Sequence, residues 1–363
     1  MRIALLNLPV DNNFGGNLQR YALIKTLESL GHDVTFLLCL SSEKKYSPIV
    51  LGARYLKRIV KKICFDSNIE IFVEKNRKKK KENNEKLVLE FIKENFNTSE
   101  FIYNKEGLKR YINNNTFDAY VVGSDQVWRK LITREYGITN YFFDFLPSES
   151  SSLRIAYAAS LGTNVNELTD LEISNLGSLY SKFSYVSVRE KSALEMLKKY
   201  GWNSPDASVL IDPTFLLSKR DYQNLIKNGH TKKTNGNMFC YILDKDDNKK
   251  NIIIQESQQR NLIPFEASLN DTTSLSIYQW LRSFDDSDFI VTDSFHGVVF
   301  SLIFNKPFKF ISNHFRGNSR FESLFEILKI NENTENLNWN EINEIIECQR
   351  KISLTYLKKA LTK

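Results

Sequence analysis

Short apolar runs alternate with longer amphipathic segments along the chain, and this pattern starts at the first residues. Ile3–Leu8 is an apolar run of strand length, followed by the polar and glycine-containing stretch Asp11–Gly16. Apolar positions then recur at helical spacing over Tyr21–Leu30, and Val34–Leu40 supplies a second apolar run. Such runs are typical of buried parallel strands. The order strand, glycine loop, helix and strand predicts the opening of a doubly wound α/β domain.

The alternation continues through the rest of the chain and divides it in two. The first half is completed by apolar runs at Asp118–Val122, Arg154–Ser160, Tyr185–Val188 and Val209–Pro213. After a polar linker with a helix at 219–237, the pattern predicts strands at Phe239–Leu243, Ile252–Ile254, Phe289–Asp293 and Lys309–Ile311, and helices at Tyr278–Phe284 and Gly297–Phe304. We therefore expect two α/β domains, 1–215 and 216–335, with helices over 336–363 that pack back on the first domain.

Residues 55–97 interrupt this alternation and predict a helical insertion in the first domain. Leu56, Ile59, Val60 and Ile63 recur on one face of a helix, and the basic run Lys75–Lys81 follows. Lysines on a helical segment are typical of a solvated face, but an apolar stripe beside them is also typical of a helix that lies on anionic lipid. Both interpretations stay open at this point.

Composition narrows the class of protein. The chain has 363 residues, of which 42% are hydrophobic, enough for more than one core. Its four cysteines lie far apart without a CxxC pair, which favours reduced thiols in the cytoplasm over a disulfide framework or a zinc site.

The N-terminus indicates no signal peptide, and Asp293, His296 and Lys306 interrupt the most apolar long stretch, so no membrane span is expected. The net charge of +7 favours anionic substrates or surfaces, or reflects ordinary lysine enrichment.

The segment Asp288–Gly297 has the pattern of an anion-binding site. An apolar strand leads to Asp293 and Ser294, and a helix begins at once, with either residue able to cap it. Free backbone amides and the positive end of the helix dipole attract an anion to such a helix start. His296 falls in the first turn, where it can hydrogen-bond a phosphate or carboxylate. The alternative is a histidine that satisfies a buried carbonyl.

Two further predicted strands end in polar side chains. Arg189 ends the strand that begins at Tyr185, and arginine can give a carboxylate or phosphate two parallel hydrogen bonds, unless it pairs with Glu190. Gly123–Trp128 follows another strand and offers hydroxyl, carboxylate and amide groups to a sugar, with Trp128 able to stack on its face. A turn and a helix cap explain the same residues. Ligands of open α/β sheets bind at the carboxyl ends of strands, so these are places to expect a site.

The loop after the first strand, Asn12–Gln19, has neither a dinucleotide-binding fingerprint nor a Walker lysine. Gln19 lies in the first turns of the following helix and can reach a cleft, or the segment is an ordinary loop and helix start. Arg316, Asn318 and Arg320 follow the last predicted strand and can close over an anion or form a solvated loop. Nothing in the sequence indicates a Ser-His-Asp triad, a GxSxG elbow or a two-metal carboxylate cluster.

Four motifs, Gly123–Trp128, Ser187–Glu190, Asp212–Thr214 and Thr292–Gly297, occur in the order and rough spacing seen in the polysaccharide pyruvyl transferases. Phe14–Leu23 also resembles the first loop and helix of that family, so the resemblance runs from about residue 3 to residue 321. The resemblance implies a GT-B-like fold, with two Rossmann-like domains that face a cleft. It also implies phosphoenolpyruvate as the donor substrate, with no cofactor and no metal.

The resemblance also assigns roles to individual residues. Family positions that match Arg189 and His296 are associated with the donor, so these two are the expected catalytic residues. Some relatives have an arginine two residues before the histidine, where this chain has Ser294, and Arg316 and Arg320 are the expected replacements. The expected donor-binding residues are Ser294, Gly297, Arg316 and Arg320. The expected acceptor-binding residues are Asn17, Gln19, Ser124, Asp125, Gln126 and Trp128.

The implied activity is transfer of a pyruvyl group from phosphoenolpyruvate to a sugar of a lipid-linked glycan, as a cyclic ketal, in the biosynthesis of an exopolysaccharide or capsule. The expected partners are the donor, the glycan acceptor and an anionic membrane, with no nucleic acid. The expected location is the cytoplasm, including the inner face of the plasma membrane. Two alternatives stay open. One is a GT-B glycosyltransferase that uses a nucleotide sugar, for which we find no clear acidic residue near a ribose. The other is an inactive sugar-binding member of a polysaccharide assembly cluster, with which Ser294 is compatible.

Overall fold

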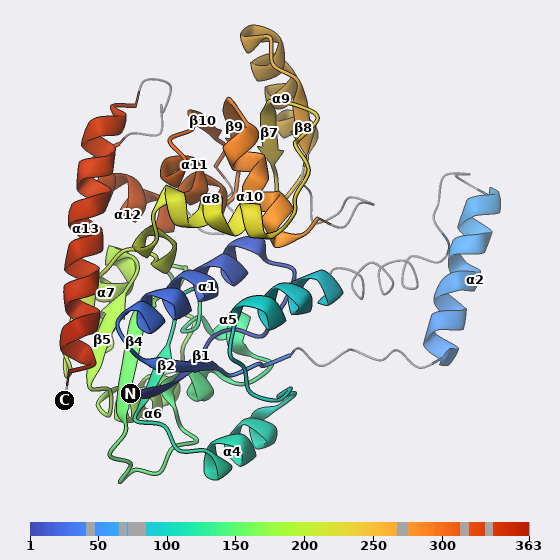
Figure 1. Ribbon diagram of the computed structural model, residues 1–363. Coiled ribbons are helices and arrows are strands. Elements are labelled where there is room, and N and C mark those ends of the chain that lie inside the picture. Colours follow the sequence, from blue (N-terminus) through green and yellow to red (C-terminus); the bar gives the residue numbers. More distant parts are fainter. Residues whose placement is uncertain are drawn as a thin grey trace.

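The computed structural model describes residues 1–40, 48–64, 71, 85–266, 275–312, 319–330 and 337–362. Within these residues the chain forms two parallel sheets, one above the other in Figure 1, with helices around both. We call the lower sheet with its helices the first unit and the upper sheet with its helices the second unit. The two parallel sheets confirm the α/β class expected from the sequence.

The first unit contains a six-stranded sheet in the order β2-β1-β3-β4-β5-β6, with every neighbouring pair parallel. Its strands are β1 (Arg2–Leu6), β2 (Asp33–Phe36), β3 (Ala119–Val122), β4 (Leu153–Ala159), β5 (Tyr185–Val188) and β6 (Ala207–Val209). β1 and β3 are buried almost throughout, as the unbroken apolar runs of a parallel sheet require. The order reverses at β1, so the sheet is doubly wound.

The second unit contains a four-stranded sheet in the order β10-β9-β7-β8, again parallel throughout. Its strands are β7 (Met238–Tyr241), β8 (Pro264–Glu266), β9 (Phe289–Thr292) and β10 (Phe308–Phe310). β7 and β9 form its centre and are fully buried. These two strands deliver the loops that face the first unit.

Helices connect the strands in both units. Those that precede residue 217 are α1 (Phe14–Ser29), α2 (Pro48–Cys64), the helix at 85–95, α4 (Lys105–Asn114), α5 (Lys130–Thr133), η1 (Ile138–Phe142), α6 (Asp170–Tyr180), α7 (Lys191–Lys199) and η2 (Pro213–Leu216). The later helices are α8 (Lys219–Asn228), α9 (Asp247–Arg260), α10 (Ile277–Asp286), α11 (Phe295–Ile303), α12 (Ser319–Leu328) and α13 (Trp339–Ala360). None of the helices that the structure describes is both long and apolar enough to cross a bilayer.

One prediction about the second unit is wrong. Ile252–Ile254 was expected to form a strand, but the three residues lie inside helix α9. Asp246 begins this helix, because its side chain accepts a hydrogen bond from the Lys249 amide. The run of isoleucines spans both sides of the helix, with Ile253 buried and Ile254 about half exposed. The strand of this region is β8, a few residues later.

The two units share one apolar core. Phe14, at the start of α1, stacks on Trp280 of α10 with ring centroids 5.6 Å apart, and its ring edge meets Tyr241 of β7. A single buried cluster joins side chains of β1 and α1 to side chains of β7, α10 and α11. The boundary between the units is therefore packed rather than open along the side where α1 and α10 meet.

Helix α13 runs along both units, and the C-terminus lies near β5 (Figure 1). Its Arg350 donates hydrogen bonds to the carbonyl oxygens of Phe215 and Leu217, and its Tyr356 ring meets Tyr185 of β5 edge-on. The tail thus forms one long helix that spans the connection between the sheets.

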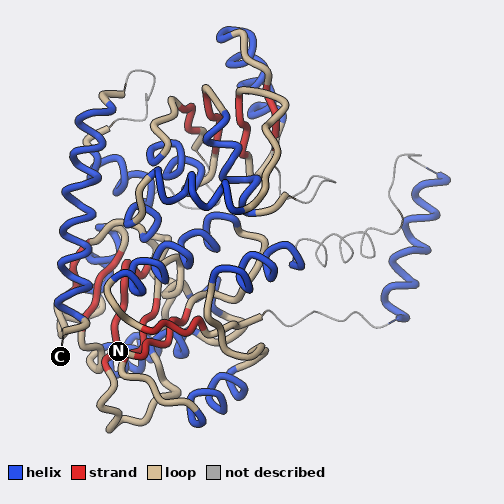
Figure 2. Tube along the Cα trace, viewed as in Figure 1, coloured by secondary structure: helices blue, strands red, loops and turns tan. Residues whose placement is uncertain are grey.

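The predicted insertion contains α2 and the helix at 85–95. Figure 2 shows α2 separated from the other helices and strands. Leu56 and Val60 on α2 are 65% and 56% exposed, and Lys57 and Lys61 beside them are exposed as well. The basic run Lys75–Lys81 lies outside the described residues.

Candidate active site

A pocket of about 690 Å³ lies between the carboxyl ends of the two sheets. The first unit contributes the loop after β1 and the segment after β3, and the second unit contributes the loops after β7 and β9. The lining residues are Asp11, Asn12, Asn13, Asp125, Gln126, Arg129, Leu131, Ile132, Tyr241, Leu243, Asp244, Asp293, Ser294, Phe295, His296, Arg320 and Phe321. This is the crevice in which doubly wound α/β proteins bind ligands.

Helix α11 begins at the pocket. Ser294 is its N-cap, and the Ser294 hydroxyl accepts a hydrogen bond from the Gly297 amide at 3.4 Å. Gly297 allows the helix to lie close to β9, since a β-carbon there would come within 2.1 Å of the Thr292 hydroxyl oxygen. The first amides of a helix have no acceptor within the helix, and its dipole is positive at this end. The pocket therefore contains a helix start that suits an anion.

Asp293 has a structural role at the same strand end. Its carboxylate accepts hydrogen bonds from the Leu243 amide at 2.7 Å and from the Lys249 ammonium at 2.9 Å. These bonds join the loop after β7 to the end of β9. Of the two residues that could have capped α11, Ser294 is thus the one that does.

His296 lies in the first turn of α11 and reaches across to the first unit. The side chain is only 7% exposed, and the ring packs on the backbone of Gly15 in α1. The imidazole Nε2 lies 3.8 Å from Oδ2 of Asp212 and has no hydrogen bond within the described part of the chain. The sequence prediction placed His296 at an anion site, and the structure adds a carboxylate from the opposite unit.

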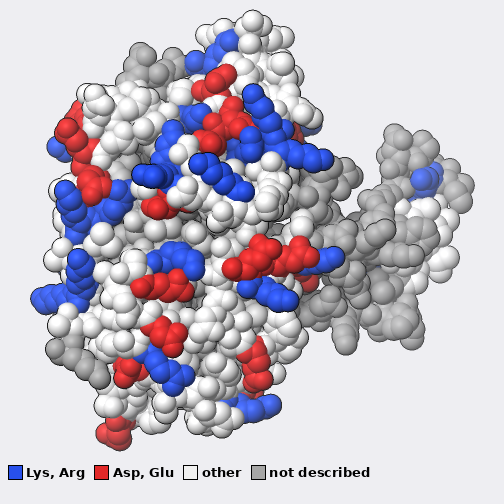
Figure 3. Space-filling view, viewed as in Figure 1, with Lys and Arg blue, Asp and Glu red and all other residues white. Residues whose placement is uncertain are grey.

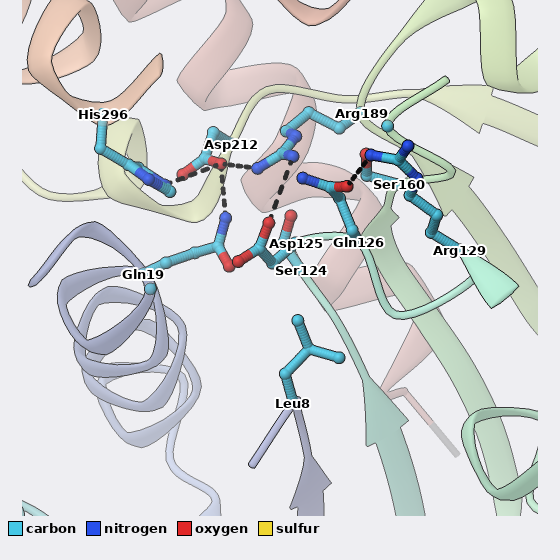
Figure 4. Close-up of polar contacts among 12 residues, drawn as sticks. Leu8, Gln19, Ser124, Asp125, Gln126, Arg129, Ser160, Arg189, Asp212 and His296 are labelled. Carbon is cyan, nitrogen blue, oxygen red and sulfur yellow. Dashed lines mark hydrogen bonds and ion pairs between the residues drawn. The ribbon is translucent and has the colours of Figure 1, made fainter. Parts of the chain in front are cut away.

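Asp212 connects side chains from α1, from the segment after β5 and from α11 (Figure 4). Its Oδ2 accepts hydrogen bonds from Gln19 Nε2 at 2.6 Å and from Arg189 Nη1 at 2.7 Å. Its Oδ1 accepts from the amide and the hydroxyl of Thr214. Burial would raise the pKa of Asp212, but the contacts with His296 and Arg189 outweigh it and hold that pKa well below its usual range.

Arg189 lies behind the pocket and is not among its lining residues. Besides Asp212, its guanidinium contacts Asp125 at 3.6 Å and Glu190 at 3.7 Å. Burial would lower the pKa of Arg189, but the three carboxylates raise it. We expected this side chain to bind the donor directly. In the structure it is 3% exposed and engaged by three acids, so it holds the carboxylates that shape the site.

Arg320, on α12, lines the pocket from the second unit. Its guanidinium lies 5.4 Å from the centre of the Phe295 ring, and Arg189 lies 4.6 Å from the same ring. Burial and the neighbouring Arg189 charge lower the pKa of Arg320 to about 10, which leaves it charged at neutral pH. The other expected replacement for the missing arginine, Arg316, lies outside the described residues.

The motif Gly123–Trp128 divides between the pocket and the core. Asp125 and Gln126 line the pocket, and their contact with an acceptor stays a prediction. Ser124 is fully buried and donates to the Ala158 carbonyl oxygen at 2.6 Å, so its hydroxyl does not face a ligand. Trp128 stacks on Phe142, and its indole N–H donates to the Tyr141 carbonyl. A ring that is 3% exposed offers no face to a sugar, so our expectation for Trp128 is corrected.

Two acceptor-binding residues expected on α1 have internal partners instead. The Asn17 amide donates to the carbonyls of Asp11 and Asn13 and accepts from Arg20, which fixes the loop before α1. Gln19 is fully buried, and its amide nitrogen is bound to Asp212. Both side chains support the site rather than line it.

Burial alone would raise the pKa of Asp125, but the charges of Arg189, His296 and Arg320 outweigh it and lower that pKa. Asp125 is therefore ionised at neutral pH. It presents a carboxylate on the first-unit wall of the pocket, where the hydroxyl groups of a sugar could donate to it.

Sequence reasoning missed three residues of this site. Arg129 lines the pocket and binds Gln126 Oε1 at 2.9 Å and Glu167 at 3.0 Å, and its position directly after the Gly123–Trp128 motif was an available signal. Asp212 stood in a motif without a role, because the partners that give it one lie far away in sequence. Gly15 was read only as part of a loop, and its contact with His296 has no local signature.

A family model described as polysaccharide pyruvyl transferase matches residues 13–314 of the sequence. A search of curated proteins with this sequence found no match. Among solved structures, a putative UDP-N-acetylglucosamine 2-epimerase from Listeria monocytogenes is similar over 99% of this chain and 90% of that chain, with a TM-score of 0.50 and 10% identity. A UDP-GlcNAc 2-epimerase from Neisseria meningitidis, bound to UDP-GlcNAc, is similar over 100% and 95%, with a TM-score of 0.47 and 9% identity. The first likeness supports the GT-B-like fold expected above.

Proposed function

The chain belongs to the polysaccharide pyruvyl transferase family, and on that premise we propose that it transfers a pyruvyl group from phosphoenolpyruvate to a sugar of a glycan as a cyclic ketal. The observation that carries the proposal is the convergence of the α11 N-terminus, His296 and Arg320 in one pocket between the sheets. The donor carries a phosphate and a carboxylate. A helix start, an arginine and a histidine are groups that bind both.

The donor would lie against the second-unit wall of the pocket. Arg320 replaces the arginine that some relatives have at the position of Ser294, and Ser294 itself serves as the helix cap. Arg129 supplies a second guanidinium from the first unit. Hydrogen bonds to Gln126 and Glu167 hold Arg129 in place, and Arg129 still lines the pocket. The proposed binding therefore uses side-chain cations and backbone amides and no metal ion, and activity in EDTA checks that part of the proposal.

In the proposed reaction an acceptor hydroxyl adds to the central carbon of phosphoenolpyruvate, and the methylene carbon takes up a proton to become a methyl group. Phosphate then leaves with its bonding electron pair, and a second hydroxyl adds to the same carbon and closes the ketal. The two hydroxyl protons end on the methyl group and on the phosphate, so the reaction balances. His296 is the proposed acid for one of these transfers, an effect worth roughly 10²–10⁴-fold in rate.

The acceptor would lie against the first-unit wall. Asp125 and Gln126, with Asn12 and Asn13 from the loop after β1, give this wall carboxylate and amide groups that can bind sugar hydroxyls. A lipid-linked acceptor would bring the enzyme to the cytoplasmic face of the membrane, and α2 exposes apolar and basic side chains together, as interfacial helices do. On the face drawn in Figure 3, basic and acidic side chains of the described residues are interspersed. This face therefore has no large basic patch that could contact an anionic membrane in place of α2.

The test is to incubate the purified protein with phosphoenolpyruvate and glycan acceptors. Release of inorganic phosphate that depends on the acceptor, with a mass gain of one pyruvate ketal on the glycan, is the expected result. His296→Gln should abolish most of the release, whereas Arg220→Gln, at an exposed position that is not among the pocket-lining residues, should not. Sugar transfer from a nucleotide sugar, without use of phosphoenolpyruvate, would instead make the protein a glycosyltransferase. Glycan binding without either reaction would make it a sugar-binding protein.

A further inference from the structure

Asp212 is held rigidly at the boundary between the two units. It caps η2 in the first unit and is 2% exposed. Its Oδ1 accepts from the Thr214 amide at 3.0 Å and from the Thr214 hydroxyl at 2.7 Å. Two bonds on one oxygen fix the plane of the carboxylate, and the second oxygen, Oδ2, is thereby directed into the cluster shown in Figure 4.

Oδ2 is the point at which the two units meet. Gln19 and Arg189, both from the first unit, donate to it at 2.6 and 2.7 Å. His296, from the second unit, approaches the same oxygen with Nε2 at 3.8 Å. Nε2 is buried and has no hydrogen bond among the described residues. Hydrogen bonds of catalytic groups are often long in the free enzyme and shorten when the substrate is bound.

Charges of both signs surround the imidazole. Asp212 is the nearest carboxylate, and Asp125 is the second acid that interacts with it. Arg189 lies on the far side of Asp212, while Arg320, Arg129 and Asp11 line the pocket with His296, whose own helix contributes its positive end. Of these groups only Asp212 directs an oxygen at a ring nitrogen.

We propose that Asp212 is the positioning residue of His296. Its Oδ2 accepts the Nε2 proton of the imidazole across the boundary between the units, orients the ring towards the donor and stabilises the positive charge that the imidazole carries when it is protonated. This inference rests on the proposed function and deepens it. It assigns to Asp212 an action on the catalytic acid, in addition to its bonds with Gln19 and Arg189.

The assignment fixes which proton moves. A protonated imidazole carries a proton on each nitrogen, and Asp212 retains the one on Nε2. The proton on Nδ1 is therefore the one that His296 gives to the methylene carbon as the acceptor oxygen bonds to the central carbon. The proton that the acceptor hydroxyl loses returns to Nδ1, so the imidazole is restored when phosphate leaves.

The pair also couples catalysis to the arrangement of the units. Asp212 caps η2 of the first unit and His296 lies in α11 of the second, so neither unit contains the pair alone. A relative movement that separates the units by a few ångströms would leave His296 without its carboxylate. The active acid is then assembled only in the closed arrangement.

The direct test follows the resonances of the His296 ring by NMR in the enzyme without substrate, with His296→Gln to assign them among the four histidines. Asp212→Asn should move the pH at which His296 titrates to lower values. Thr214→Val, which removes a bond from the other carboxylate oxygen, should leave the titration where it is. In turnover assays Asp212→Asn should lower kcat roughly 10²-fold, towards the value of His296→Gln, and shift the pH profile with a smaller change in KM for phosphoenolpyruvate.

The NMR titration does not depend on enzymatic activity, so it tests this inference separately from the proposed function. An unshifted His296 titration in Asp212→Asn overturns the inference even if pyruvyl transfer is established. Equal shifts in Asp212→Asn and Thr214→Val overturn it as well, because they would reflect a general disturbance of η2. If Asp212→Asn does not fold, Asp212→Glu serves in its place. The glutamate variant retains the negative charge. A His296 titration and a pH profile of turnover close to those of the wild type support the inference. A kcat and a pH profile that both match those of His296→Gln contradict it.

Discussion

The ring of His296 packs on the backbone of Gly15, although the two residues belong to different units. A β-carbon at residue 15 would come within 2.2 Å of both the imidazole Cγ and Nδ1. Real side chains do not approach this closely, so only glycine at residue 15 permits the observed position of the ring. The glycine at the start of α1 thus sets the place of a proposed catalytic group more than 280 residues later in sequence.

Gly15→Ala should therefore displace His296 without unfolding the protein. A displacement of about 1 Å at a catalytic group can cost on the order of 10²-fold in rate, and we expect a loss of kcat of that order. Gly16→Ala is the matched control in the same turn, because its β-carbon would meet the Asn13 side chain at the milder distance of 3.0 Å. Turnover measured beside thermal melting checks the prediction, and equal kcat for the two variants would contradict it.

Trp128→Ala should cost stability rather than acceptor binding. The ring packs against Phe142, Tyr180 and Phe183 in the core of the first unit, and removal of a buried tryptophan side chain costs about 3–5 kcal/mol. Urea unfolding measures that loss. The fraction that remains folded should keep its KM for the glycan, and a large rise in this KM at unchanged stability would return Trp128 to the acceptor site.

Arg320→Gln should weaken the binding of the donor more than the binding of the glycan acceptor. A hydrogen bond to a charged group contributes about 1.5–3 kcal/mol, so the KM for phosphoenolpyruvate should rise about 10- to 100-fold. Arg129→Gln should act in the same direction, because Arg129 lines the same pocket. The exposed Arg220→Gln is the control. A rise in the KM for the glycan alone would place Arg320 at the acceptor instead.

Acid should destabilise the protein through Asp212 and Asp125. The pKa of each is lower in the folded protein than its ordinary value of 3.8, so each carboxylate stabilises the fold above about pH 4. That contribution is lost as the pH falls through the folded-state values. Urea unfolding at a series of pH values should show a decline below about pH 4. Asp125→Asn should be less stable than the wild type at pH 7, and the difference should shrink in acid. A constant difference down to pH 2 would contradict this.

The α2 helix should bind anionic vesicles in preference to neutral ones. Replacement of its exposed apolar residues in the double variant Leu56→Glu and Val60→Glu should abolish sedimentation with such vesicles, and salt should weaken the binding of the wild type. Leu171→Glu is the matched control, because Leu171 is 71% exposed on α6, another helix. Equal binding to neutral and anionic vesicles, or no binding to either, would leave α2 as a solvated helix.

The elements that the sequence predicted well are those whose signals are local. The apolar run of β9, the cap at Ser294 and the first turn with His296 lie within ten residues of one another, so their pattern is complete in one stretch of chain. The α9 error has a local cause as well. Three consecutive isoleucines match a strand as well as a helix, and the deciding cap at Asp246 lies in what looked like a charged turn.

The side chains of the site were harder to predict because their roles depend on distant partners. Gln19 and Asp212 are bonded across 193 residues, and nothing near either residue indicates the other. Arg189 at a strand end matched an anion-binding arginine. Glu190 beside it was the one acidic partner that the sequence suggested, whereas Asp125 and Asp212 come from other segments of the first unit. Trp128 was misjudged for the same reason, since Phe142 and Phe183 enclose it only after the chain has folded.

The stacking of Phe14 on Trp280, within a core that extends through both units, bears on how the molecule comes apart when heated. Linked domains with a small polar interface melt independently, whereas a shared apolar interface makes each half depend on the other. Calorimetry should therefore record one endotherm whose van't Hoff enthalpy equals the calorimetric enthalpy. A fragment that ends near residue 215 would expose Phe14 and the remaining half of that core to water, and we expect it to aggregate rather than to fold.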